Sequence, residues 1–266
     1  MMQIRSGILF AVALLGLCAW PHVARPVNLG LEVTPGKLEV SIPAGLSYNI
    51  PITVHNSGFD STYVQATMVD FGVTMAGNYQ FEKVGKRPYS LMKYAAIRPR
   101  AFNIAPGTSQ QVQLTITMPH NPHLAGEYAG IIFFQTRPQR QAHQAVAFSE
   151  RVASKIYETI PNTVKVEGAI TKMNAIAAKG GEIYRIMFHN TGNAHVYLRG
   201  QVAVQKKGGG AVYQVALPNN ELVERGGNRL LEVTGKRLPP GAYQAIATID
   251  YGGKTDTAGG INVTVR

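Results

Sequence analysis

Apolar and polar residues alternate along most of the chain, in short segments separated by turn residues. In the first half these segments are residues 31–33, 38–42, 48–54, 63–71, 101–104, 112–118 and 128–134. In the second half they are residues 164–173, 182–189, 196–205, 213–217, 228–233, 242–251 and 260–265. A period of two predicts half-buried strands, and the Pro, Gly and Asn residues between them predict turns. The pattern therefore predicts an all-β protein.

Two short motifs occur once in each half of the chain. His-Asn-Ser-Gly at residues 55–58 and His-Asn-Thr-Gly at residues 189–192 each end a predicted strand. Gly-x-Tyr at residues 126–128 and 241–243 begins another. We therefore expect two tandem β-sandwiches, over residues 25–161 and 162–266, with His55 and His189 forming hydrogen bonds within their turns.

The first 24 residues have the features of a secretory signal peptide. Arg5 precedes an apolar run over residues 8–17, and this run is too short to span a bilayer. We place cleavage near Ala24, with cleavage after Ala19 as the alternative, so the expected location is the periplasm or another exported compartment, without stable membrane insertion. Cleavage would also remove Cys18, the only cysteine. Each domain must then be stabilised by apolar burial without disulfides.

The chain is basic, with a formal net charge of +11. Diffuse positive charge favours acidic partners, and it also promotes solubility alone. Residues 72–94 make the first half longer than the second and mix Tyr and Phe with Lys and Arg. Such a mixture can bind single-stranded nucleic acid. Because an exported protein seldom meets nucleic acid, we interpret this region as a surface loop and expect no nucleic-acid partner.

The sequence contains little that indicates catalysis. His120 and His123 lie in a predicted loop and lack a Cys or acidic residue at a spacing typical of zinc sites. Gly-Lys-Thr at residues 253–255 lacks the leading glycine of a phosphate-binding loop. Asp250 and Asp256 flank a glycine-containing turn and are interpreted as turn formers. We therefore expect no enzyme activity, no metal site and no cofactor.

A long extended segment over residues 146–166 closes the first half, after a polar hairpin loop at residues 137–147. Val146, Phe148, Val152 and Ile156 share one parity and would lie on one face of a strand. Ser149, Arg151 and Lys155 would lie on the opposite face.

Residues 96–107, the alternating residues 111–116 and the strand beginning at Gly126 resemble the PapD-like periplasmic pilus-assembly chaperones, as does the ending Lys-Ile-Tyr-Glu-Thr-Ile-Pro at 155–161. The resemblance covers roughly residues 29–161. It implies two immunoglobulin-like domains with a cleft between them. It also implies that the long strand donates its apolar face, Val146, Phe148, Val152 and Ile156, to an incomplete pilus subunit. Lys37 and Lys155 correspond to the basic residues that hold the subunit's terminal carboxylate.

The chain departs from the family pattern in its ending, where Thr159-Ile160 replaces an aromatic-basic pair, and in Glu150, which interrupts the donor face. A second interpretation is therefore an immunoglobulin-like envelope scaffold that binds a cell-surface or cell-wall-associated partner. A scaffold would keep the even-numbered face buried under its own sheet. The expected partners are pilus or surface-structure subunits and an outer-membrane usher, and an open edge strand also permits self-association.

Overall fold

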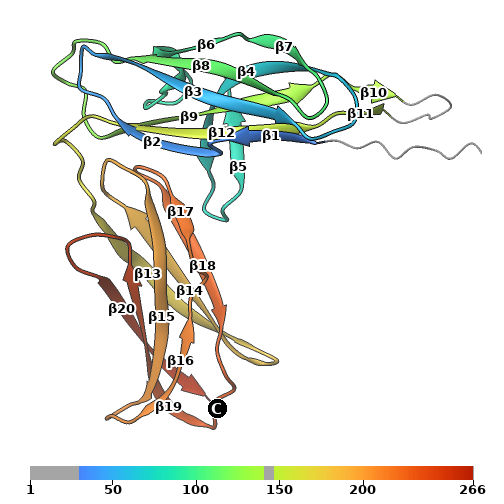
Figure 1. The fold of residues 1–266 in the computed structure, drawn as a ribbon. Coiled ribbons are helices and arrows are strands. Elements are labelled where there is room, and N and C mark those ends of the chain that lie inside the picture. Colours follow the sequence, from blue (N-terminus) through green and yellow to red (C-terminus); the bar gives the residue numbers. More distant parts are fainter. Residues whose placement is uncertain (1–29, 141–146, 266) are drawn as a thin grey trace, which may run out of the picture.

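The computed structural model describes residues 30–140 and 147–265, and these form two β-sandwiches in sequence order (Figure 1). The predicted signal peptide, with Cys18 and the cleavage site near Ala24, lies outside the described residues, as does Val146. The expected all-β fold of two tandem sandwiches is confirmed. No helix in the described part of the chain has the length and apolar character needed to cross a bilayer.

The first sandwich contains every element up to β12 and one short 3-10 helix, η1. In chain order these are β1 (Leu31–Thr34), β2 (Lys37–Ser41), β3 (Ser47–Asn56), β4 (Thr62–Val73), β5 (Tyr79–Glu82), η1 (Met92–Tyr94), β6 (Ala95–Arg98), β7 (Ala101–Ile104), β8 (Ser109–Thr117), β9 (Glu127–Thr136), β10 (Gln139–Arg140), β11 (Ala147–Phe148) and β12 (Arg151–Thr159).

Two main sheets enclose the core of the first sandwich. One has the order β1-β3-β8-β6, and the other has the order β2-β12-β9-β4-β5 with β7 also paired to β4. Their inner faces bury alternate residues, among them Ile52 and Leu114 from the first sheet and Ile132 and Phe134 from the second. The period-two pattern of the sequence thus has the expected cause, because one face of each strand is in the core.

The chain changes sheets between β1 and β2. β1 is antiparallel to β3 in the first sheet, whereas β2 is parallel to β12 in the second. The crossing occurs at Pro35 and Gly36, and the Lys155 amide donates to the Gly36 carbonyl at 2.9 Å. As a result, one edge of the second sheet is formed by β2 over part of its length only.

Residues 72–94 differ from the surface loop expected from the sequence. β5 pairs with β4 and extends the second sheet, and η1 follows it. The turn after β5 is fixed by buried Asp70, whose carboxylate accepts hydrogen bonds from the Ser90 hydroxyl at 2.6 Å and the Arg87 amide at 3.0 Å. The aromatic residues of this region are therefore held on a sheet.

The long strand predicted over residues 146–166 is interrupted. The short β11 pairs with β10, and β12 begins at Arg151 after a break at Ser149 and Glu150. The Glu150 carboxylate accepts a hydrogen bond from the Leu31 amide at 2.9 Å, which ties the break to the start of β1. A charged residue on the predicted apolar face thus has a specific structural partner.

The second sandwich is formed by the last eight strands. These are β13 (Gly168–Ala178), β14 (Gly181–Asn190), β15 (Val196–Lys206), β16 (Ala211–Ala216), β17 (Glu221–Val223), β18 (Asn228–Thr234), β19 (Gly241–Asp250) and β20 (Thr257–Val265). One sheet has the order β13-β14-β18 and the other the order β16-β15-β19-β20, with β17 also paired to β15. Tyr184, Phe188 and Leu198 are among the fully buried residues between the sheets.

The duplicated motif owes its structural role to its asparagine. Asn56 and Asn190 are both buried, and the side-chain oxygen of each accepts the amide of the glycine two residues later. The side-chain nitrogens donate to backbone carbonyls elsewhere in the same domain, and that of Asn190 reaches three. The sequence predicted that His55 and His189 form hydrogen bonds within their turns, and this prediction is wrong. His55 contacts Ser109 of β8, and His189 contacts the Gly227 carbonyl beside β18.

Candidate partner-binding site

Lys37 and Lys155 are direct neighbours in the sheet. In the parallel pairing of β2 with β12, the register places the Cα of Lys155 opposite that of Lys37. Both residues therefore lie on the same face, which is the outer face of the second sheet. The two lysines that the family resemblance implied are thus brought together by the fold.

Each lysine already has a partner within the chain. The Lys37 Nζ lies 2.7 Å from Glu39 Oε1, and the Lys155 Nζ donates to the Tyr79 hydroxyl at 2.8 Å. Hydrogen bonding to Glu39 raises the pKa of Lys37, and the same contact lowers the pKa of Glu39. Both ammonium groups also lie near aromatic rings, with Lys37 5.1 Å from the centre of Tyr197 and Lys155 5.2 Å from that of Tyr79.

Beside this pair, no described strand pairs with the outer edge of β12, although the buried Ser154 hydroxyl donates to the Pro35 carbonyl at 2.7 Å. We call this stretch the open edge. The β2 register covers only residues 155–159, and β1 is paired with β3 in the other sheet. Among the described residues, Arg151–Ser154 therefore pair with a strand on the β9 side alone. Because the Lys155 amide points toward β2, alternation along the strand points the amides of Arg151 and Ala153 toward the open edge.

The predicted donor residues fall into different environments. Phe148 is 41% exposed on β11, Val152 is half-buried against the first core, and Ile156 is fully buried within it. Val146 lies outside the described residues. For Ile156, the expectation of a face available to a partner does not fit the structure, because its side chain packs in the core of its own domain. Phe148 and Val152 remain accessible candidates.

The outer face of the second sheet is unusually apolar. Phe71, Ile131 and Tyr157 form a buried cluster there, with Val69, Val73 and Phe133 packed against it. From β5, Tyr79 and Phe81 extend this cluster, and the Phe81 and Phe133 rings meet edge-on at 5.0 Å. An antiparallel sheet with one solvated face normally carries polar residues on that face, so this face is not an ordinary solvated one.

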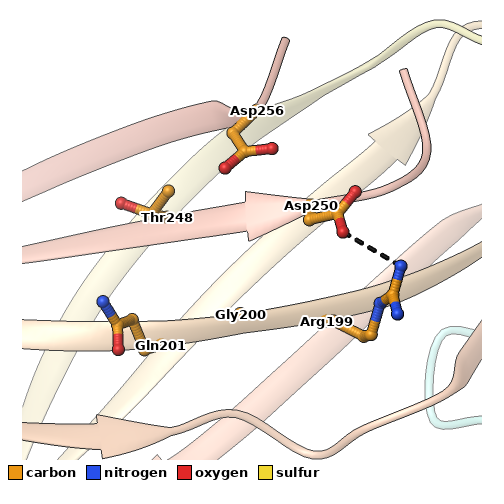
Figure 2. Close-up of a pocket in the computed structure, with 6 residues that line it drawn as sticks. All are labelled: Arg199, Gly200, Gln201, Thr248, Asp250 and Asp256. Carbon is orange, nitrogen blue, oxygen red and sulfur yellow. Dashed lines mark hydrogen bonds and ion pairs between the residues drawn. The ribbon is translucent and has the colours of Figure 1, made fainter. Parts of the chain in front are cut away.

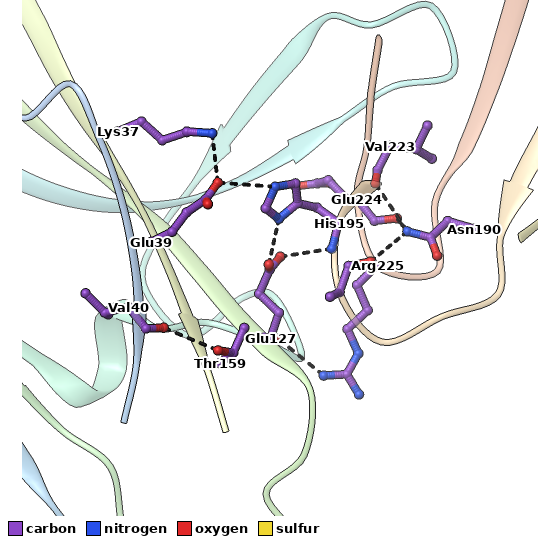
Figure 3. Close-up of polar contacts among 11 residues, drawn as sticks. Lys37, Glu39, Val40, Glu127, Thr159, Asn190, His195, Val223, Glu224 and Arg225 are labelled. Atoms are coloured by element: carbon purple, nitrogen blue, oxygen red, sulfur yellow. Dashed lines mark hydrogen bonds and ion pairs between the residues drawn. The ribbon is translucent and has the colours of Figure 1, made fainter. Parts of the chain in front are cut away.

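His195 of the second domain covers part of this face. Its ring stacks on Tyr157 with centroids 4.0 Å apart, and its Nδ1 lies 2.6 Å from Glu127 Oε2 at the start of β9. The His195 amide also donates to Glu127, and Glu39 Oε1 lies 3.7 Å from His195 Nε2. A polar chain from Lys37 through Glu39 and His195 to Glu127 thus joins the lysine pair to the domain interface (Figure 3).

Other side chains tie the two domains together around this chain. The Arg225 guanidinium donates to the Ala125 and Glu127 carbonyls and lies 3.3 Å from the centre of the Tyr89 ring. The Glu224 carboxylate accepts the Val73 amide at 2.8 Å. Burial raises the pKa of Glu224. Backbone hydrogen bonds add to these contacts, so the orientation of the domains is fixed by several independent bonds.

Glu158 is the acidic residue of β12. Its side chain is fully buried on the inner face; Oε1 accepts the Ile42 amide at 3.3 Å, and Oε2 has no hydrogen-bond partner among the described residues. Burial raises the pKa of Glu158 to about 7. This carboxyl group faces away from the lysine pair and belongs to the packing of β12 against its own domain.

A separate polar hollow lies in the second domain, lined by Arg199, Gln201, Thr248, Asp250 and Asp256 (Figure 2). Asp250 uses one oxygen for Arg199 at 3.1 Å and the other for the Gly252 amide at 2.8 Å, so it forms the turn predicted for it. Over residues 30–140 and 147–265, no group of three or more His, Cys, Asp or Glu side chains could hold a metal ion.

Several residues of the site could not be recognised in the sequence. Glu39 follows Lys37 by two residues, which on a strand places both on one face, and this spacing was the available signal. Tyr79 lies on a strand expected to be loop, and His195 comes from the other domain. Nothing local in the sequence marks either as a neighbour of Lys155 or Glu127.

Comparisons with known proteins place this geometry in a structural context. No protein-family model matches the sequence, and a search of curated proteins finds no significant match. The class 5 fimbriae chaperone CfaA superposes with a TM-score of 0.50 at 10% identity, over 89% of this chain and 99% of that one. This chain has the fold of a fimbrial chaperone.

Two further solved structures are similar at lower scores. The Escherichia coli chaperone DraB gives a TM-score of 0.45 at 16% identity, over 89% of this chain and 98% of that one. A structure of Salmonella enterica SafA pilin in complex with the SafB chaperone gives 0.46 at 10% identity, over 90% of this chain and 97% of that one. The alignment with CfaA spans both sandwiches, so the chaperone-like fold includes the second domain, where the sequence resemblance was weak.

Proposed function

We propose that this protein is an exported, non-enzymatic chaperone that holds an incomplete pilus or surface-structure subunit by adding a strand of that subunit to the open edge of β12. The observation that carries the proposal is the placement of Lys37 opposite Lys155 at the point where the open edge ends. The CfaA-like fold is consistent with this role.

The position of β2 fixes where an added strand must stop. β2 occupies the edge of β12 from Lys155 onward, so a partner strand can pair only with the residues before it. The end of that strand nearest β2 then lies beside the two lysines. A terminal carboxylate is stabilised there by two ammonium groups, whereas a terminal ammonium is repelled.

The charge therefore also sets the direction of the partner. A strand whose carboxyl end lies at Lys155 runs in the same direction as β12, and it would be parallel to β12 as β2 is. The outward amides of Arg151 and Ala153 supply backbone hydrogen bonds, and Phe148 and Val152 supply apolar contact beside them. Main-chain pairing gives affinity for many sequences, and the carboxylate fixes their register.

The charge part of the proposal is tested with a fluorescent decapeptide of alternating valine and serine, prepared with a free terminal carboxylate and as the terminal amide. Lys37→Ala and Lys155→Ala should each weaken binding of the carboxylate form by about tenfold, because each removes a charged hydrogen-bond partner. Binding of the amide form should change little. Lys172→Ala, which removes an exposed strand lysine of the second domain, is the matched control. Equal binding of the two peptides to every variant would exclude the anchor.

The strand part is tested separately with Ala153→Pro. Proline removes the outward amide while the β9 pairing of its neighbours is kept, and edge positions tolerate proline. Weaker binding of both peptides, with an unchanged circular dichroism spectrum, is the expected result. Undiminished binding of both peptides would show that they do not pair with this edge.

The burial of Ile156 favours an envelope scaffold as the second candidate function, because a scaffold keeps the even-numbered face in its own core. A scaffold does not require selectivity for a free chain end. Binding of an envelope partner that is unaffected by both lysine substitutions and by Ala153→Pro would support the scaffold over the chaperone.

A further inference from the structure

We infer that Glu39 is an internal substitute for the partner's carboxylate: it occupies Lys37 in the free protein and must be displaced when a partner binds. This inference rests on the proposed function and adds a residue that sets the strength of the site. It derives from one contact, the 2.7 Å ion pair between Lys37 Nζ and Glu39 Oε1.

The geometry supports exchange of one carboxylate for another. Lys37 and Glu39 lie on the outer face of β2, which is the edge strand of its sheet, and both side chains are about half exposed. Neither side chain is packed in the core, so the ion pair can separate without a change in the packing of the sandwich. An exposed ion pair is also weak enough for a second carboxylate to compete with it.

Glu39 has a second position to which it can move. The same oxygen that contacts Lys37, Oε1, already lies 3.7 Å from His195 Nε2 (Figure 3). Released from Lys37, the carboxylate can stay beside the imidazole, so displacement does not leave it without a polar neighbour. Lys155 differs from Lys37, because its intramolecular partner is the Tyr79 hydroxyl, which can remain bonded while a carboxylate approaches.

Two consequences follow for affinity. Bonding to Glu39 offsets the charge of Lys37, so a partner's carboxylate gains less from this lysine than from a free one. It is also repelled by the Glu39 carboxylate. Removing the charge of Glu39 should therefore tighten binding of carboxylate-ended partners and leave amide-ended partners unaffected. An exposed pair of this kind predicts an effect of about two- to fivefold.

The test uses the full chain, the two decapeptides described above and Glu39→Gln. Binding of the carboxylate peptide should tighten by about two- to fivefold. Glu39→Gln should tighten it by clearly less when Lys37 is already alanine, because only the repulsion by Glu39 is then removed. Glu232→Gln is the matched control, because it neutralises an acid in an equally exposed ion pair, with Arg185, in the second domain. Glu39→Ala provides a second variant if the glutamine itself bonds to Lys37.

The outcomes separate the two proposals. If Lys37→Ala and Lys155→Ala weaken binding but neither Glu39 variant tightens it, the role of Glu39 is wrong and the anchor stands. A gain of the same size without Lys37 would also overturn the inference, because it would reflect the charge of Glu39 alone and not its bond to Lys37. If the lysine substitutions have no effect on the carboxylate peptide, the anchor fails and the role of Glu39 fails with it.

Discussion

Substitution of Glu158 by Gln should abolish most of a pH dependence in the stability of the first domain. Glu158 is fully buried, its Oε1 accepts only the Ile42 amide, and its Oε2 is unpaired among the described residues. Burial therefore favours the protonated form and raises the pKa from its ordinary value of 4.5 to about 7. The folded state holds this proton at a pH where the unfolded chain has already released it.

The sign and size follow from proton linkage. Between the unfolded and folded pKa values the folded state binds more protons, so the free energy of unfolding falls as pH rises. The loss begins near pH 4.5 and is complete above about pH 7. One pKa unit corresponds to about 1.36 kcal/mol, so the total loss is roughly 3 kcal/mol.

The measurement is urea unfolding of the wild type and Glu158→Gln, followed by circular dichroism at several pH values. The difference in unfolding free energy between the two proteins should grow by roughly 3 kcal/mol in favour of the variant between pH 4.5 and 7.5, and then stay constant. Comparing the two proteins cancels contributions from other groups such as Glu224. A difference that does not vary with pH would refute the assignment of a buried, protonated carboxyl group at this position.

Two further predictions concern the folded frame of the site. Asn190→Ala should lower the unfolding free energy of the second domain by about 2–4 kcal/mol, since it removes side-chain hydrogen bonds to the carbonyls of Ala194, Val223 and Glu224, the first two of them buried; a loss under about 0.5 kcal/mol, as for a typical surface substitution, would contradict this. Arg225→Ala removes the bonds to Ala125 and Glu127 and the contact with Tyr89, so the radius of gyration from X-ray scattering should rise while each domain stays folded. An unchanged radius would show that the remaining interface bonds hold the domains without Arg225.

Period-two alternation predicted the strands well where one face is buried and the other is exposed to solvent. It could not distinguish Ile156 from Val152, because the two share parity, and only the position of the opposite sheet decides that Ile156 is enclosed while Val152 is at the margin. It also missed β5, whose Tyr79 and Phe81 face an outer surface that is apolar for reasons set by β4 and β9.

The candidate site was predictable only where local pattern determines it. Lys37 and Lys155 were found through the family resemblance, and the register of β2 against β12 then aligned them. The contact of His195 with Glu127 joins residues 68 positions apart across two domains, and no periodicity within either strand specifies it. The same holds for Arg225 and Tyr89, which meet only because the domains are fixed at one angle.

The start of β2 at Lys37 has a consequence for which chain ends can bind beside it. If the lysine pair holds a terminal carboxylate, the site recognises the carboxyl terminus of a chain as well as its apolar strand. A polypeptide still joined to tRNA lacks that group, and in a chain extended at its carboxyl end the group lies beyond the position of the two lysines. The boundary between an open edge and a closed one on β12 would then favour strands whose chain ends at this position over strands that continue past it.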